Sequence, residues 1–255
     1  MDKKLNILHL ELFLVLLIFP LFTMGCRKES IQLYGENLQT EIILPEGQRI
    51  FIDVIGEDFP SSPFTTEDIM AVTFSGPDHY NPDLIESFPG KTMLFTKDSC
   101  EQEGINLKMI PSARNEGDKI TDTNATNYLL LISTDDCNIL YCGDIGQDHF
   151  TPEQLDIIGD IDICFMPLEN RYCNMTMKNK KGFTLIKELN PRIVIPLRYK
   201  DSSLEYTVEN FTVYTSLQTP ASIPIDKIPE KTSFLIIDRM AAVYHDIYKT
   251  RIWKN

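Results

Sequence analysis

Short apolar runs separated by turn residues fill the first half of the chain. Residues 40–56 read as two strands on either side of a Pro-Glu-Gly turn. Residues 127–134 and 138–144 flank an Asp-Asp-Cys turn, which predicts a hairpin. Further apolar runs predict strands at residues 69–74, 91–96 and 105–111, and residues 81–88 predict a short helix. This spacing is typical of sheets formed early in the chain.

The second half alternates between helical and strand patterns. A capped helix is expected at residues 151–159 and another at 179–189, with buried strands at 161–167 and 191–199. From about residue 200 the pattern is less regular. The pattern there predicts strands at residues 211–216 and 233–238. The Pro-rich segment between them, residues 219–231, is expected to be a linker. The order favours a layered α/β sandwich over a doubly wound parallel sheet.

The N-terminus has the pattern of an export signal. A short positive end precedes an apolar stretch at residues 12–22, which is too short to span a bilayer comfortably. Small residues then lead to Cys26 and a polar segment, an order that resembles a bacterial lipoprotein signal. The resemblance implies cleavage before Cys26, which would carry the lipid. An ordinary secretory signal or an uncleaved anchor is the alternative.

These patterns predict three parts of the chain. Residues 1–25 are expected to be the signal peptide, residues 26–40 a tether and residues 41–255 one folded domain, whose part after about residue 200 is the least certain. The expected location is the bacterial cell envelope, outside the cytoplasm. The membrane would then be a partner through the lipid on Cys26.

Composition narrows the other partners. Hydrophobic residues make up 43% and charged residues 24%, as in globular proteins with a real core. The 37 acidic and 24 basic residues give a net charge of −13, which repels nucleic acid, so none is expected as a partner. Five cysteines besides Cys26 show no C-x-x-C spacing, so neither a zinc ribbon nor a redox motif is supported. Cys142 and Cys164 lie in apolar runs and are expected in the core.

One stretch carries candidate metal chemistry. "TFSGPDHYNPD", residues 73–83, resembles the first metal motif of the metallo-β-lactamase superfamily, T-H-x-H-x-D-H at the end of a strand. Asp78 and His79 fall in place. Phe74 and Gly76 stand where the family has histidines. The closest resemblance is to the branch of L-ascorbate-6-phosphate lactonase-like hydrolases.

Four more segments resemble the family in the right order, so that the likeness spans about residues 41–200. "RIFIDVI" places Asp53 at the end of a strand, and "NILYCGDIG" places Asp144 where the family has a metal-bridging aspartate. "DIDICFMPLENRYCNMT" resembles a later strand and loop. "PRIVIPLRY" places Arg198 where a histidine closes the second metal site, and Arg114 is nearest to the family's remaining histidine. The resemblance implies an αββα sandwich.

The departures from the family pattern bear on function. The resemblance implies that three histidines and the bridging aspartate hold one metal, and this chain has Phe74, Gly76 and Arg114 at the histidine positions. None of these side chains ligates zinc. The second metal would need Asp78, His79, Asp144 and the residue at position 198. An arginine there brings a permanent positive charge to a cation site.

Two hypotheses follow for this site. In the first, Arg198, and with it Arg114, compensates the charge of the carboxylates, and an ion-pair cluster without any cofactor replaces the metals. In the second, Asp78, His79 and Asp144 retain a single zinc or other divalent ion. Both require Asp53, Asp78, His79, Asp144 and Arg198 to meet in one cleft at the strand ends. The first also requires the guanidinium of Arg198 at hydrogen-bond distance, roughly 2.7–3.2 Å, from Asp78 or Asp144.

The sequence favours a non-catalytic binding or structural lipoprotein, with the metal centre largely lost. The alternative is a hydrolase with a single metal, acting on an ester, lactone or phosphodiester, or with His79 as a general base. Whether the protein is an enzyme stays open at this stage. The sequence names neither a small-molecule ligand nor a protein partner.

Overall fold

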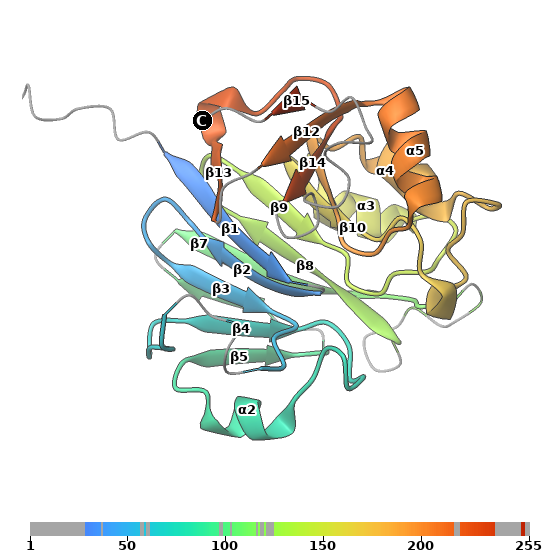
Figure 1. Ribbon diagram of the computed structural model, residues 1–255. Coiled ribbons are helices and arrows are strands. Elements are labelled where there is room, and N and C mark those ends of the chain that lie inside the picture. The colour runs from blue at the N-terminus through green and yellow to red at the C-terminus, as the bar shows by residue number, and fades with distance from the viewer. Residues whose placement is uncertain are drawn as a thin grey trace, which may run out of the picture.

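Two sheets packed face to face form the centre of the molecule (Figure 1). The structure is a computed structural model that describes residues 29–36, 38–56, 59, 62–96, 99–102, 104–115, 117, 120, 125–216, 220–237 and 251–252. The signal segment expected at residues 1–25, and Cys26, lie outside the described residues. No described helix has the length and apolar character needed to cross a membrane.

The first sheet has six strands in the order β13-β1-β2-β3-β4-β5. Their bounds are β1 Ser30–Glu36, β2 Gln39–Ile43, β3 Arg49–Ile52, β4 Ile69–Val72, β5 Lys91–Leu94 and β13 Ala221–Pro224. β3, β4 and β5 are parallel, whereas β1 is antiparallel to both of its neighbours. The parallel part matters for function because β3 and β4 end at the same edge.

The second sheet has nine strands in the order β15-β12-β14-β11-β10-β9-β8-β7-β6. Their bounds are β6 Ser99–Gln102, β7 Ile105–Ser112, β8 Asn127–Ser133, β9 Asn138–Tyr141, β10 Ile163–Met166, β11 Ile193–Pro196, β12 Thr212–Ser216, β14 Ser233–Ile237 and β15 Arg251–Ile252. β6 to β9 form an antiparallel meander, and β9, β10 and β11 are parallel.

Helices cover the outer faces of both sheets. α2 (Pro82–Ser87) lies against the first sheet, where Leu84 packs in a small cluster with Phe51 and Phe88. α3 (Pro152–Ile158), α4 (Lys181–Leu189) and α5 (Asp201–Asn210) lie on the second sheet (Figure 1). The largest apolar cluster takes side chains from both sheets. The predicted αββα sandwich is confirmed.

Local sequence explains where two of these helices begin. The Asn81 side chain accepts hydrogen bonds from the backbone N–H groups of Asp83 and Leu84 at the start of α2. α3 begins with a capping box in which Thr151 and Gln154 satisfy each other's backbone N–H groups. In both cases a proline occupies the first turn, where its missing N–H costs nothing.

The structure corrects the predicted tether and linker. Residues 26–40 were expected to be a tether, yet they contain β1, whose Ile31 and Leu33 are fully buried. The linker expected at residues 219–231 contains β13, which pairs with β1 at the edge of the first sheet. The chain after residue 200 therefore contributes strands to both sheets of the sandwich. The ten-residue helix α5 and the edge strand β6 were not predicted.

Candidate functional site

The candidate site lies at one edge of the sandwich, where several strands end. Asp53 follows β3 and Thr73 follows β4 in the first sheet, whereas Asp144 follows β9 and Arg198 follows β11 in the second. Arg114 follows β7, which runs in the same direction as β9 because two antiparallel pairings separate them. Carboxyl ends of parallel strands are the usual place for sites in α/β sheets.

Asp53 lies behind His79 rather than in the cleft. It is fully buried, and its carboxylate accepts hydrogen bonds from Thr73 N and Thr73 Oγ1, both at 2.7 Å. The second oxygen also lies 2.8 Å from His79 Nδ1. The φ of Asp53 is 53°, a left-handed conformation that aspartate tolerates better than most residues. This backbone turn directs the carboxylate at the imidazole and fixes its orientation.

His79 is a buried cation held between carboxylates. Its Nε2 lies 3.5 Å from Asp144 Oδ2 and 3.8 Å from Asp78 Oδ2. Burial alone would lower the pKa of His79, but the charges of Asp53 and Asp144 and the hydrogen bond with Asp53 outweigh it and raise the pKa to about 10. The imidazole is therefore charged at neutral pH.

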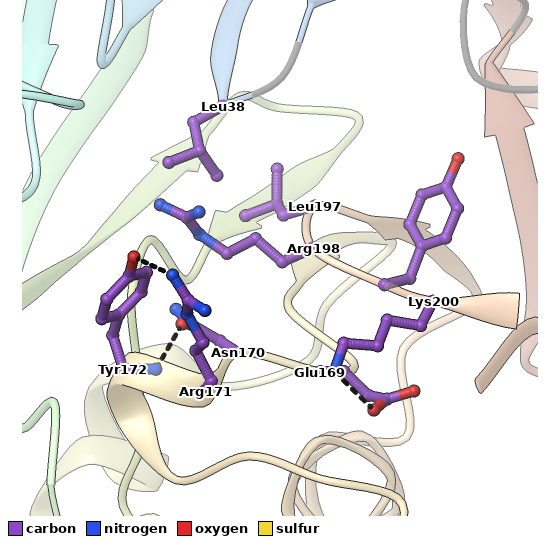
Figure 2. Close-up of a pocket in the computed structure, with 9 residues that line it drawn as sticks. Leu38, Glu169, Asn170, Arg171, Tyr172, Leu197, Arg198 and Lys200 are labelled. Carbon is purple, nitrogen blue, oxygen red and sulfur yellow. Dashed lines mark hydrogen bonds and ion pairs between the residues drawn. The ribbon is translucent and has the colours of Figure 1, made fainter. Parts of the chain in front are cut away.

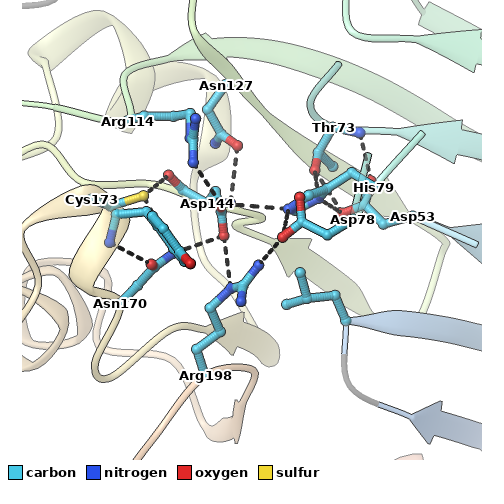
Figure 3. Close-up of polar contacts among 12 residues, drawn as sticks. Asp53, Thr73, Asp78, His79, Arg114, Asn127, Asp144, Asn170, Cys173 and Arg198 are labelled. Atoms are coloured by element: carbon cyan, nitrogen blue, oxygen red, sulfur yellow. Dashed lines mark hydrogen bonds and ion pairs between the residues drawn. The ribbon is translucent and has the colours of Figure 1, made fainter. Parts of the chain in front are cut away.

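Asp144 is the centre of the cluster. It is 1% exposed, and its Oδ1 accepts hydrogen bonds from Asn170 Nδ2 at 2.8 Å and Arg198 Nε at 3.0 Å. Its Oδ2 accepts one from Arg114 Nη2 at 3.1 Å. Burial would raise the pKa of Asp144, but His79, Arg198 and Arg114 together hold that pKa below its ordinary value. The carboxylate is thus fully compensated by neighbouring donors (Figure 3).

Arg198 joins the two carboxylates across the cleft. Besides its bond to Asp144, its Nη2 donates to Asp78 Oδ2 at 2.6 Å. The distance to Asp144 falls within the range expected from the sequence, and the distance to Asp78 is slightly shorter. The predicted approach of Asp78 to Asp144 is confirmed because their ligand atoms lie within 4.8 Å of each other. The cluster contains three cationic and three anionic side chains: His79, Arg114, Arg198, Asp53, Asp78 and Asp144.

The residues at the three histidine positions pack against one another. The guanidinium carbon of Arg114 lies 3.9 Å from the centre of the Phe74 ring, a cation–π contact. The Phe74 ring also meets His79 edge to face, at 5.5 Å between centroids. A Cβ at Gly76 would lie 2.2 Å from Phe74 Cε1, so the ring occupies this place only because residue 76 is glycine. The three replacements form one packed unit.

Comparison with known proteins agrees with this geometry. The beta-lactamase superfamily domain matches residues 37–198, well over half of the chain. The chain belongs to the metallo-β-lactamase superfamily. None of the curated proteins compared with it matches.

Several solved structures share the fold at low sequence identity. A protein from Thermotoga maritima described as a zinc-dependent hydrolase has a TM-score of 0.58 and 16% identity, over 82% of this chain and 99% of its own. A protein from Parabacteroides distasonis described as a metal-dependent hydrolase has a TM-score of 0.51 and 17% identity, over 70% and 86%. YhfI from Bacillus subtilis has a TM-score of 0.50 and 8% identity, over 81% and 95%. Identities this low show the fold alone.

The donor set of this superfamily member does not fit a two-metal centre. The first site offers no side-chain ligand from Phe74 or Gly76, and Arg114 brings a cation into it. Asp78, His79 and Asp144 still offer three ligand atoms within 4.8 Å of one another. Arg198, however, donates hydrogen bonds to both carboxylates of that group.

Sequence reasoning missed several residues of the cluster. Asn127 Oδ1 accepts from the backbone N of Asp144 at 3.0 Å, and the Cys173 thiol donates to the backbone carbonyl of Asp144 at 3.1 Å. Burial raises the pKa of Cys173 to about 11, so this thiol is not a nucleophile at neutral pH. Of these residues, Asn170 could have been predicted from the sequence, because it follows a buried strand as Asp144 does.

Proposed function

We propose that this superfamily member is a non-catalytic binding protein in which an ion-pair cluster replaces the metal centre. The observation that carries the proposal is the position of Arg198, which hydrogen-bonds both Asp78 and Asp144. A guanidinium stays protonated in proteins, so it supplies the positive charge that two close carboxylates require. A metal at the same carboxylates would have to displace it.

General-base catalysis by His79 without a metal has little geometric support. Both ring nitrogens face carboxylates, Nδ1 toward Asp53 and Nε2 toward Asp144, and the side chain is fully buried. A base must reach the proton that it removes from a substrate. The buried imidazole of His79 instead supports the cluster as a cation.

The second candidate is a hydrolase with one divalent ion. The three ligand atoms of Asp78, His79 and Asp144 favour it, and so does His79 Nε2, which is buried without a hydrogen-bond partner in the described part of the chain. If such an ion bound, these three residues would hold it, and it would supply activated water for ester, lactone or phosphodiester cleavage. Arg198 would then have to leave both carboxylates.

A hydrolysis assay separates the two candidates. The purified protein is incubated with a lactone and with a phosphodiester, after chelation and again with added zinc. The proposal expects no turnover above that of a protein-free blank in either condition. Turnover by the wild type that depends on zinc would decide for the hydrolase.

We also propose that the protein is a lipoprotein of the bacterial envelope, anchored through Cys26. The support is the apolar stretch at residues 12–22 followed by small residues and that cysteine. The first described strand, β1, begins at Ser30, so only a few residues would separate the anchor from the folded domain. On this proposal the sandwich lies close to the membrane surface.

A further inference from the structure

A cavity of about 510 Å³ opens beside the ion-pair cluster. Nine residues line it, and they come chiefly from the loops that follow β10 and β11: Leu38, Glu169, Asn170, Arg171, Tyr172, Leu197, Arg198, Tyr199 and Lys200 (Figure 2). These loops are tied together because the backbone N–H groups of Leu168 and Glu169 both donate to Arg198 O. The cavity walls are therefore held in place by the fold.

Most of the charged side chains that line this cavity are cationic, although the chain as a whole is acidic. Arg171, Arg198 and Lys200 are cationic and Glu169 is acidic, in a protein with 37 acidic and 24 basic residues. Glu169 is 9% exposed and accepts a hydrogen bond from Ser202 Oγ at 2.7 Å, which ties the start of α5 to the loop. It lies 4.0 Å from Lys200 Nζ. Glu169 thus offsets Lys200, and Asp78 and Asp144 offset Arg198, so that Arg171 has no carboxylate partner among the described residues.

Arg171 is the cation with the least compensation. Within the described residues no carboxylate forms an ion pair with it, and its guanidinium lies 4.7 Å from the Tyr172 ring centre. Its Nη2 also donates to Tyr172 Oη at 2.6 Å. In Figure 2 the head groups of Arg171 and Arg198 lie in the same part of the cavity. Arginines placed in this way offer N–H groups to a carboxylate or phosphate.

Asn170 connects Arg171 to the ion-pair cluster. Its Nδ2 donates to Asp144 Oδ1 at 2.8 Å, and its Oδ1 accepts from Tyr172 N at 3.1 Å. The same amide therefore fixes the short 3₁₀ turn Arg171–Cys173 that presents Arg171. A preorganised cation binds an anion with a smaller loss of conformational entropy.

The remaining lining suits an apolar body. Leu38 and Leu197 are 5% and 7% exposed, and Tyr199 is partly buried. Tyr172 is 59% exposed, more than any other large hydrophobic side chain among the described residues. An exposed aromatic ring beside arginines is a surface on which a flat or apolar group can pack.

We infer that this cavity, the anion pocket, binds a small organic anion in which a carboxylate or phosphate group is joined to an apolar body. The inference rests on the proposed binding function and assigns its ligand class. Arg171 and Lys200 contact the anionic group, Arg198 keeps its bonds to Asp78 and Asp144 at the edge of the pocket, and Tyr172 and the two leucines contact the apolar body. Phosphate and carboxylate share this chemistry, so the test includes both.

Calorimetric titration tests the anion pocket with three probes: phenyl phosphate, benzoate and the neutral benzyl alcohol. The wild type is compared with Arg171→Ala/Lys200→Ala. The control, Lys178→Ala/Lys187→Ala, removes the same charge from exposed residues outside the pocket. Arg198 is left intact because it belongs to the ion-pair cluster. All samples contain a chelator, and free phenol is measured to detect hydrolysis.

The inference expects at least one of the two anions to bind the wild type and the control variant with equal affinity. Benzyl alcohol should bind neither of these two proteins. The pocket variant should bind the anion at least about tenfold more weakly, since each lost contact with a charged donor has an effect of that order. The anion that binds more tightly shows whether the pocket prefers a phosphate or a carboxylate group. Binding of neither anion, or equal weakening in both variants, would overturn the inference.

The same titration keeps the two proposals apart. Failure to bind anions by a protein that also lacks hydrolytic activity would overturn the anion pocket and leave the non-catalytic reading standing. Release of phenol from bound phenyl phosphate would overturn the non-catalytic reading and leave the anion pocket standing.

Discussion

Arg198 Nε lies 3.0 Å from Asp144 Oδ1, although the two residues are 54 positions apart in the chain. Asp144 is 1% exposed, whereas 24% of the Arg198 side chain is exposed. The contact therefore joins a buried carboxylate to a cation at the floor of the cleft. Its energetic importance can be measured, because breaking it leaves a buried charge with fewer partners.

Replacing Arg198 by alanine should destabilise the protein. Removing one partner of a buried ion pair typically costs about 3–5 kcal/mol, and the lower end applies here because Asn170 and Arg114 still bond Asp144. Denaturant unfolding measures the change. Asp78→Asn is the matched control, since Asp78 is 51% exposed and its bond to Arg198 should contribute at most about 1 kcal/mol. Equal effects in both variants would show that burial of Asp144 does not govern the cluster.

Gly76→Ala should also destabilise the protein. The added Cβ would lie 2.2 Å from Phe74 Cε1, and overpacking of this kind costs about 1–3 kcal/mol. In a Phe74→Ala background the clash with the ring disappears, so the cost of Gly76→Ala should be clearly smaller there. A double-mutant cycle by denaturant unfolding measures the difference. Additive effects would contradict the view that these two replacements are packed as a unit.

The stability of the protein should depend on pH through His79. Its pKa is raised from 6.5 to about 10, so its contribution is complete below pH 6.5 and is lost as the pH rises toward 10. The free energy of unfolding should fall between pH 6.5 and 8 by at most about 1.4 kcal/mol per pH unit. Thiols of the unfolded chain begin to ionise at the upper end of this window, so the slope of the wild type is compared with that of the variant over pH 6.5–7.5. His79→Asn should remove that slope, and a slope unchanged in the variant would assign it to other groups.

At acid pH the free energy of unfolding should change in the opposite direction, rising as the pH rises. The pKa of Asp144 is held below 3.8, so its contribution is present above that pH and is lost as the pH falls through the lowered value. Together the two groups place the highest stability between about pH 4 and 6.5. The same unfolding series, extended to acid pH, measures this second limb.

Cys26→Ser should release the protein from the membrane or leave it unprocessed. The lipid would be attached to that cysteine, and a serine has no thiol to accept it. Membrane fractionation and mass spectrometry of the N-terminus measure anchoring and processing. Cys100→Ser is a suitable control, because Cys100 is a free, buried cysteine within the fold. A Cys26→Ser protein that is processed and membrane-bound as before would contradict the lipoprotein proposal.

Local sequence was enough to predict most of the sandwich, because its central strands are strongly apolar. β13 was missed because its partner is β1, far away in the sequence, and because the prolines around it suggested a linker. β1 was missed although it pairs with the neighbouring strand β2, because its residues were assigned to the polar tether. Proline is tolerated at a sheet edge, which is where β13 lies. The error at β13 concerns long-range pairing, which the local pattern does not encode.

The candidate site was predicted in part. Asp78, His79, Asp144, Arg114 and Arg198 do meet, because each belongs to a motif at a strand end. Asp53 was expected in the cleft but lies beneath His79, as its left-handed backbone directs the carboxylate inward. The stacking of Arg114 on Phe74 depends on side-chain packing across the two sheets, and no spacing in the sequence predicts it.

The most direct test of the central claim is the zinc bound per chain by the chelator-treated wild type, measured by equilibrium dialysis and elemental mass spectrometry. Arg198→His is the positive control, because its imidazole adds a fourth ligand to Asp78, His79 and Asp144. Arg198→Gln is the charge control, because it removes the positive charge without adding an imidazole ligand. The account predicts that only Arg198→His takes up about one zinc ion and is stabilised by it, by about 2.7 kcal/mol at a hundredfold excess over Kd. One or more zinc ions bound stoichiometrically by the wild type would contradict the account.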